Sequence, residues 1–275
     1  MFRYYTTHMK GPILSLGPIV GLALLFVLGL PIFALQYNRR GRPRTDRIER
    51  AGGSILLSRW FMEYGYWLMR VPARTLVALG VSPDMVTLLG LATISLGSAA
   101  VGFGHFGLGG WLMLFGAMLD AIDGMVARES GRSSDAGEFF DAVVDRYAEI
   151  ASYIGLCYYY NDRPWAMGAV LGGLLGSLMV SYCRAKAEAL GVADAPSGLM
   201  RRHERALYLG LGIALAPVVS FFQEPGDDHP VYYLTVIACA MVGLLANISA
   251  LRMASYVKTR LHQDAAAGKA DDEPR

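Results

Sequence analysis

Four aspartates at helical spacing are the chemically most informative residues of the chain. Asp120 and Asp123 lie three positions apart, and Asp141 and Asp145 lie four positions apart. Residues at these spacings share one face of a helix, so each pair points in a single direction. A short connection lets two such helices run antiparallel, which brings the pairs face to face. The pattern therefore predicts a carboxylate site built from two helices.

A cluster of carboxylates requires a counter-charge, because like charges at close range repel one another. Hard divalent cations prefer oxygen ligands, so such a cation is the expected partner. Long apolar runs flank the cluster, and carboxylates at a membrane boundary usually mark a functional site. Two ordinary helix ends with acidic residues in water would explain neither the pairing nor the apolar flanks.

Composition indicates a membrane protein. The chain is 54% hydrophobic and 17% charged, with a mean hydropathy of +0.35, and a membrane span needs about 20 apolar residues. The expected spans are runs of that length: Ile13–Leu35, two within Met85–Leu119 separated at Gly102–Gly110, Gly137–Tyr160, Trp165–Cys183, Ala206–Phe222 and Val231–Leu251. The predicted fold is an all-α integral membrane protein with a six-helix transmembrane core and one extra N-terminal transmembrane helix.

An amphipathic helix is expected before the core, over Ser54–Leu79. Its apolar side chains recur at helical spacing, opposite a charged stripe, as in helices that lie in the membrane surface. The apolar stripe comprises Leu57, Trp60, Tyr64, Trp67, Leu68 and Val71, and the charged stripe Arg59, Glu63, Arg70 and Arg74. We expect an anchor and basic linker over 1–50, a catalytic domain over 51–260 and a disordered tail over 261–275.

The distribution of basic residues predicts the topology. Arg and Lys gather in 37–83, 128–136, 184–205 and from 252 onward, whereas the other side receives only Arg3, Lys10 and Arg163. This asymmetry follows the positive-inside rule. It predicts a multi-pass protein of the cell (inner) membrane whose aspartates face the cytoplasm. The net charge of +2 carries no further information, and we expect no nucleic-acid partner.

Two further groups of residues have alternative interpretations. Arg184, Lys186, Arg202 and Arg205 collect on the aspartate side, either as a solvated loop or as an anion site. A ladder of small residues, Gly168, Gly172 and Gly176, permits close helix approach within the molecule or across a homodimer. The three cysteines, Cys157, Cys183 and Cys239, have no metal-ligand spacing and are expected to be buried small hydrophobes.

Together the carboxylates, a divalent metal and a basic patch at a membrane favour phosphoryl transfer from a lipid pyrophosphate to a cytosolic alcohol. The segment from Asp120 to Asp145 reads D-x2-D-G-x2-A-R-x8-G-x3-D-x3-D. This pattern resembles the signature of the CDP-alcohol phosphotransferase family at every fixed position. The resemblance extends over roughly Ile55–Val257 and leaves the first expected span outside the usual core.

The resemblance implies a reaction in which a CDP-activated lipid, CDP-diacylglycerol or similar, donates its phosphatidyl group to an alcohol and CMP leaves. It implies that Asp120, Asp123 and Asp141 bind Mg²⁺ or Mn²⁺, with two ions expected. Asp145 is implied as a further metal ligand and as the catalytic base. The CDP-lipid site is implied at four more positions: Gly124, Ala127, Arg128 and Gly137.

For the acceptor, the segments around Arg184–Glu188 and Arg202–Arg205 resemble the phosphatidylinositol phosphate and archaetidylinositol phosphate synthase branch. That branch implies a phosphorylated polyol, inositol phosphate, as the acceptor. The basic residues implied to bind its phosphate are Arg184, Lys186, Arg202, Arg205 and Arg252. A glycerol-phosphate acceptor, as in phosphatidylglycerophosphate synthases, is the alternative. A membrane prenyltransferase is the alternative from another class, although such enzymes use Asp-rich D-x3-D motifs without the Gly and Ala-Arg positions.

Overall fold

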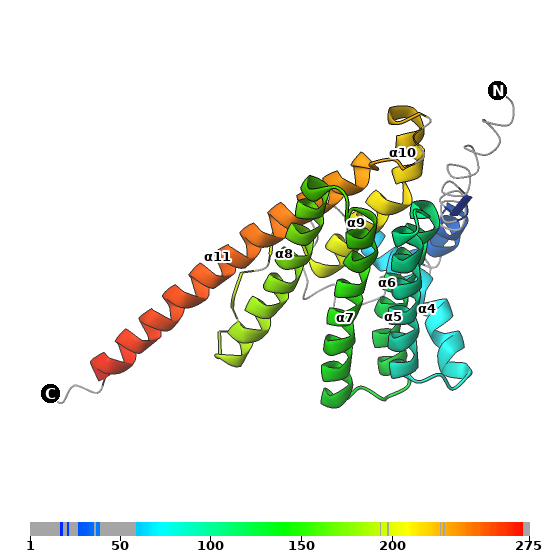
Figure 1. Cartoon of the computed structure of the whole chain (residues 1–275). Helices are drawn as coiled ribbons and strands as arrows, with labels where there is room; N and C mark the ends of the chain where they lie inside the picture. Colours follow the sequence, from blue (N-terminus) through cyan, green and yellow to red (C-terminus); the bar gives the residue numbers. More distant parts are fainter. Residues whose placement is uncertain are drawn as a thin grey trace, which may run out of the picture.

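The computed structural model describes residues 17–18, 21, 27–35, 37–38 and 59–271, apart from 193, 197, 226 and 228. Every regular element in these residues is a helix, which confirms the all-α class for the described part of the chain (Figure 1). From Arg59 onward the helices are α4 (Arg59–Ala78), α5 (Pro83–Gly102), α6 (Phe106–Glu129), α7 (Asp135–Tyr159), α8 (Pro164–Ala189), α9 (Arg202–Ala214), α10 (Ala216–Gln223) and α11 (Tyr233–Asp271).

Four of these helices, α5, α6, α8 and α11, are long and apolar enough to cross a membrane. The pair α9–α10, bent by 44°, adds a fifth if it counts as one span. α7, which carries Asp141 and Asp145, lies outside this set. Large apolar side chains such as Leu96, Leu175 and Leu244 are exposed on the spanning helices, as expected for surfaces that contact lipid.

α5 is the scaffold against which both aspartate-bearing helices pack. A Cβ on Gly97 of α5 would lie 2.7 Å from the carbonyl oxygen of Gly109 on α6, and one on Gly116 would lie 2.8 Å from that of Gly90. A Cβ on Gly155 of α7 would collide with the backbone of α5. These glycines allow the helix backbones to approach closely. The two aspartate pairs are therefore held by one common neighbour.

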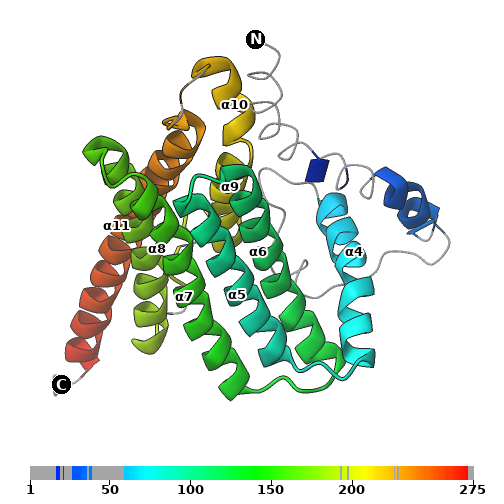
Figure 2. The ribbon, with the colours of Figure 1, turned by 45° about the vertical axis from the view of Figure 1, so that its right-hand side comes forward.

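Local signals in the sequence determine where these helices begin. The Ser82 hydroxyl accepts a hydrogen bond from the Met85 N–H at 3.3 Å, with Pro83 in the first turn of α5. Ser134 caps α7 in the same way. The glycine-rich break separates α5 from α6 at the predicted place. In Figure 2 the α6–α7 connection lies at the lower end of the molecule.

The apolar stripe of α4 does not face lipid along its whole length, which corrects one expectation. Residues 27–35 are helical, and Phe33 packs against Tyr64 and Trp67 with ring centroids 5.3 and 5.7 Å apart. Tyr64 is fully buried by this contact, and Glu63 is buried as well. The rest of the expected N-terminal span and the basic linker 39–50 lie largely or wholly outside the described residues.

Two further expectations about the helices need correction. The expected span Ala206–Phe222 is divided between α9 and α10, where Pro217 removes a backbone N–H and disfavours a continuous helix. The last helix does not end near Leu251 but continues to Asp271, beyond the point where a disordered tail was expected. Alanines in this stretch favour the helix, because alanine has the highest intrinsic helix propensity.

Candidate active site

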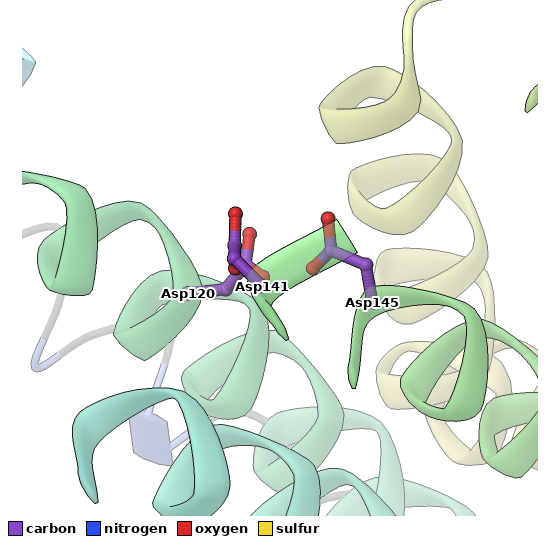
Figure 3. Close-up of side chains that lie close together, drawn as sticks. All are labelled: Asp120, Asp141 and Asp145. Atoms are coloured by element: carbon purple, nitrogen blue, oxygen red, sulfur yellow. The ribbon is translucent and has the colours of Figure 1, made fainter. Parts of the chain in front are cut away.

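Three carboxylates from two helices converge at one point. Asp120 in the second half of α6 meets Asp141 and Asp145 in the first half of α7, and one oxygen of each lies within 4.8 Å of the others (Figure 3). Asp145 is buried, and the other two are half-buried. The predicted meeting of the two helices is thus confirmed for these three residues.

Asp123 occupies a separate position, although the helical spacing paired it with Asp120 in the same site. It is buried, and its Oδ2 accepts a hydrogen bond from the Thr87 hydroxyl of α5 at 2.7 Å. Thr87 also donates to the Pro83 carbonyl oxygen, at 3.1 Å. A buried carboxylate needs such a donor, because an unsatisfied one is costly. α5 therefore fixes the orientation of Asp123, a role of Thr87 that its residue type alone did not reveal.

The converging carboxylates fit a divalent cation. The three oxygens are hard donors, come from rigid helices and lie close enough together to share one ion. Their negative charges also need compensation in a region shielded from water. Asp120, Asp141 and Asp145 are the residues that would hold such an ion first, with Asp123 one helical turn from Asp120.

Arg202, the first residue of α9, lies within this cluster. Its Nη2 donates to Oδ1 of Asp120 at 3.0 Å, and its two Nη groups also donate to both oxygens of Asp145. The sequence placed Arg202 on the same side of the membrane as the aspartates but did not predict direct contact. The partners are 82 and 57 residues away along the chain, so no local pattern could have revealed this pairing.

Arg205 has contacts that differ from those expected of an acceptor-phosphate ligand. It is buried, and its Nη2 donates to Glu149 Oε1 of α7 at 2.9 Å. Weaker contacts at 3.4 Å reach the carbonyl oxygens of Met200 and Ser177. Arg146 lies 3.1 Å from the other oxygen of Glu149. Arg205 thus joins α9 to α7 and α8 inside the protein.

The remaining predicted acceptor residues lie nearer the surface. Arg184 is half-buried and Lys186 is exposed, both near the end of α8. Arg252 is exposed on α11. These residues and Arg202 come from three different helices, so only the tertiary fold determines how they are arranged.

The predicted CDP-lipid residues lie at the facing ends of α6 and α7. A Cβ on Gly124 would lie 3.3 Å from Nη1 of Arg128, so the guanidinium of Arg128 folds back over Gly124. Ala127 is half-buried on the same helix. Gly137, in the first turn of α7, donates its N–H to the Ser134 hydroxyl at 3.1 Å. Gly124 and Gly137 each lie one helical turn from a carboxylate of the cluster, Asp120 and Asp141.

These features define a class of protein: a helical membrane protein with a carboxylate cluster between two helices that fits a divalent cation. Residues 80–250 match the family model described as CDP-alcohol phosphatidyltransferase. The chain belongs to this family and is a phosphotransferase enzyme of phospholipid synthesis.

Two relatives in particular resemble the chain over much of its length. The phosphatidylinositol phosphate synthase of Mycolicibacterium smegmatis is 31% identical over 199 residues, which cover 71% of this chain and 88% of that protein. The archaetidylinositol phosphate synthase of Pyrococcus horikoshii is 33% identical over 136 residues, covering 50% of this chain and 71% of that protein.

Solved structures of the Mycobacterium tuberculosis phosphatidylinositol phosphate synthase are also similar. The complex with manganese and citrate superimposes with a TM-score of 0.60 at 26% identity, covering 70% of this chain and 89% of that one. The complex with CDP-DAG gives a TM-score of 0.58 at 28% identity, covering 69% and 92%.

Proposed function

We propose that the protein transfers the phosphatidyl group of CDP-diacylglycerol to inositol phosphate and releases CMP. The observation that carries the proposal is the convergence of Asp120, Asp141 and Asp145 in a chain of this family. The similar enzymes are phosphatidylinositol phosphate synthases, and one of them has been solved with CDP-DAG. These likenesses support the lipid donor and favour a phosphorylated polyol as acceptor.

The proposed metal ligands are Asp120, Asp123, Asp141 and Asp145, which would hold two Mg²⁺ or Mn²⁺ ions. Manganese in the similar mycobacterial structure supports this choice. When bound, a divalent ion supplies Lewis-acid polarisation of the pyrophosphate and offsets negative charge on the leaving group. The carboxylates would determine the position of the ion, and therefore the position at which the negative charge of the leaving group is offset.

The residues of the chain have separate roles in the proposed step. Gly124, Ala127, Arg128 and Gly137 form the surface against which the CDP group lies. Asp145 accepts the proton of the acceptor hydroxyl as its oxygen forms a bond to the phosphatidyl phosphorus. The bond from that phosphorus to the CMP oxygen breaks, and CMP carries away the electron pair.

The proposed acceptor site uses basic residues of three helices: Arg184, Lys186, Arg202, Arg205 and Arg252. A phosphorylated acceptor is doubly charged, and the forked donors of arginine match a phosphate group. Of these residues, Arg205 is the least directly available to the acceptor. Its guanidinium contacts Glu149 and would have to exchange that carboxylate for the acceptor phosphate.

The proposed membrane arrangement counts six spans, with α7 and the pair α9–α10 added to the four apolar helices. An extra N-terminal helix precedes them, and the carboxylates face the cytoplasm across the inner membrane. The proposed division is an anchor and linker over 1–50, a catalytic domain over 51–260 and a tail over 261–275. A homodimer is compatible with Gly168, because a Cβ added there would meet no atom of another described helix within 4 Å.

Release of CMP from CDP-diacylglycerol by the purified protein tests this function. Inositol phosphate, glycerol phosphate, serine and inositol are offered separately with Mn²⁺ or Mg²⁺. We expect the fastest release with inositol phosphate. A preference for glycerol phosphate would instead indicate a phosphatidylglycerophosphate synthase, and a preference for free inositol would remove the need for the basic site. The family match leaves no support for the prenyltransferase alternative.

A further inference from the structure

Arg202 occupies the oxygens that a divalent cation would need. Its guanidinium donates to both oxygens of Asp145 and to one oxygen of Asp120. Both aspartates belong to the three-carboxylate set that fits a cation. An arginine and a divalent ion at the same oxygens would also repel each other. One guanidinium and one cation therefore compete for the same place.

We propose that Arg202 is an internal counter-ion, which closes the carboxylate cluster in the metal-free protein and is displaced when a divalent cation binds. The inference rests on the proposed function only through its cation site. An arginine side chain stays protonated in proteins, so it cannot leave by losing its charge. The guanidinium therefore has to move, and its two hydrogen bonds to Asp145 have to break.

The position of Arg202 permits that movement. It is the first residue of α9 and follows the long connection after α8, and 38% of its side chain is exposed. Arg205, one turn further along, is buried against Glu149 and holds the start of α9 in place. The guanidinium of Arg202 can therefore rotate away while the backbone of α9 remains fixed.

Displacement gives the site an order of events. Once displaced, the guanidinium of Arg202 has two N–H donors without a partner and lies beside the cation. A phosphate group on the acceptor can accept hydrogen bonds from both donors. The metal-free protein, in contrast, offers the acceptor neither the cation nor this arginine. Cation binding and acceptor binding are therefore linked, and each strengthens the other.

The test is Mn²⁺ binding to the purified full chain, measured by calorimetry or by electron paramagnetic resonance without either substrate. Arg202→Gln removes the competitor, so we expect Mn²⁺ to bind about ten- to hundredfold more tightly than in the wild type, the range that corresponds to lost charge-assisted hydrogen bonds. Arg132→Gln is the matched control. It removes one positive charge from an exposed position in the α6–α7 connection, and we expect a change of only about twofold.

Thermal unfolding provides a second measurement on the same variants. Without metal, Arg202→Gln leaves the carboxylates uncompensated, so Mn²⁺ should raise its melting temperature more than that of the wild type. Arg202→Lys keeps the positive charge but lacks the two parallel N–H donors of the guanidinium. We therefore expect its Mn²⁺ affinity and its melting-temperature shift to lie between those of the wild type and Arg202→Gln. This variant also serves if Arg202→Gln does not fold.

The outcomes separate the inference from the proposed function. Mn²⁺ that binds the wild type but binds Arg202→Gln equally or more weakly would overturn the role of Arg202 and leave the cation site intact. A wild type that binds no Mn²⁺, or binds it as well after Asp141→Asn, would remove the cation site and with it the basis of both proposals.

Discussion

The two ends of α7 satisfy their polar groups in different ways. In its first half, Asp145 accepts hydrogen bonds from Arg202, which also donates to Asp120 of α6. Just beyond its end, Arg163 donates to the carbonyl oxygens of His229 and Pro230, at 2.5 and 3.1 Å. Backbone carbonyls cannot be replaced as partners without unfolding a segment, whereas carboxylates can exchange an arginine for a cation. The first half of α7 can therefore take part in catalysis, whereas its far end stabilises the fold.

The far end joins two connections of the fold. The Tyr159 hydroxyl donates to the Pro230 carbonyl oxygen at 2.6 Å, and the Tyr160 hydroxyl donates to that of Val231 at 2.8 Å. These contacts hold the end of α7 to the segment before α11, and the stacking of Tyr159 on His229 adds to them. The rigidity of this end keeps α7 in place, so that its first turns present the carboxylates in a constant position.

The largest expected effect concerns the cation site. Asp141→Asn should lower the rate of CMP release by at least about a thousandfold, because a metal ion supplies several kcal/mol of charge stabilisation. Glu138→Gln, an exposed change one turn earlier on α7, is the matched control and should leave the rate within about twofold. Near wild-type turnover in a folded Asp141→Asn protein would exclude the assigned role.

An effect of comparable size is expected at the proposed base. Asp145→Asn should lower kcat by about a hundred- to ten-thousandfold, the usual contribution of a general base. The Kd for CDP-diacylglycerol, measured separately, should change far less. Losses of equal size in kcat and in lipid binding would make Asp145 a metal ligand without a role in proton transfer.

The buried pair of Arg205 and Glu149 should affect stability more than chemistry. Arg205→Met leaves Oε1 of Glu149 without its arginine, while Arg146 stays 3.1 Å from the other oxygen, so we expect a cost of about 3 kcal/mol in the free energy of unfolding. The double variant Arg205→Met with Glu149→Leu should recover much of this loss. A stable Arg205→Met protein with a raised KM for inositol phosphate alone would instead show that Arg205 acts mainly through its proposed acceptor contact and not through its pair with Glu149.

The support that α5 gives to the site should have a moderate effect. Thr87→Val keeps the shape of the side chain but removes the hydroxyl that donates to Asp123. Partners that orient metal ligands typically contribute about ten- to hundredfold to metal affinity, so Mn²⁺ binding should weaken by about tenfold. Thr93→Val, which removes a hydroxyl bonded only within α5, is the control. Equal Mn²⁺ affinities in the two variants would contradict the role of Thr87.

The smallest expected effect belongs to the far end of α7. Arg163→Gln removes charge-assisted contacts to backbone carbonyls and should cost about 1.5 kcal/mol in the free energy of unfolding. The KM values and kcat should stay near those of the wild type. A large loss of turnover with unchanged stability would show that the two ends are not as separate as their contacts indicate.

Local signals predicted much of this structure. The glycine-rich break at 102–110 marked the boundary between α5 and α6, and the spacing of the aspartates indicated that Asp120 and Asp141 would meet. The place of Arg202 could not be predicted, because helices far apart in sequence bring it to Asp145. The same holds for Tyr64, whose apolar character fits a lipid contact and a contact with Phe33 equally well.

The most direct test of the central claim uses inositol phosphate labelled in its phosphate group, together with CDP-diacylglycerol, the purified protein and Mn²⁺. The account predicts that the label appears in the extracted lipid in a one-to-one ratio with released CMP, and that Asp141→Asn abolishes both. CMP released while the label stays in the aqueous phase, or label that enters the lipid at the wild-type rate in Asp141→Asn, would contradict it.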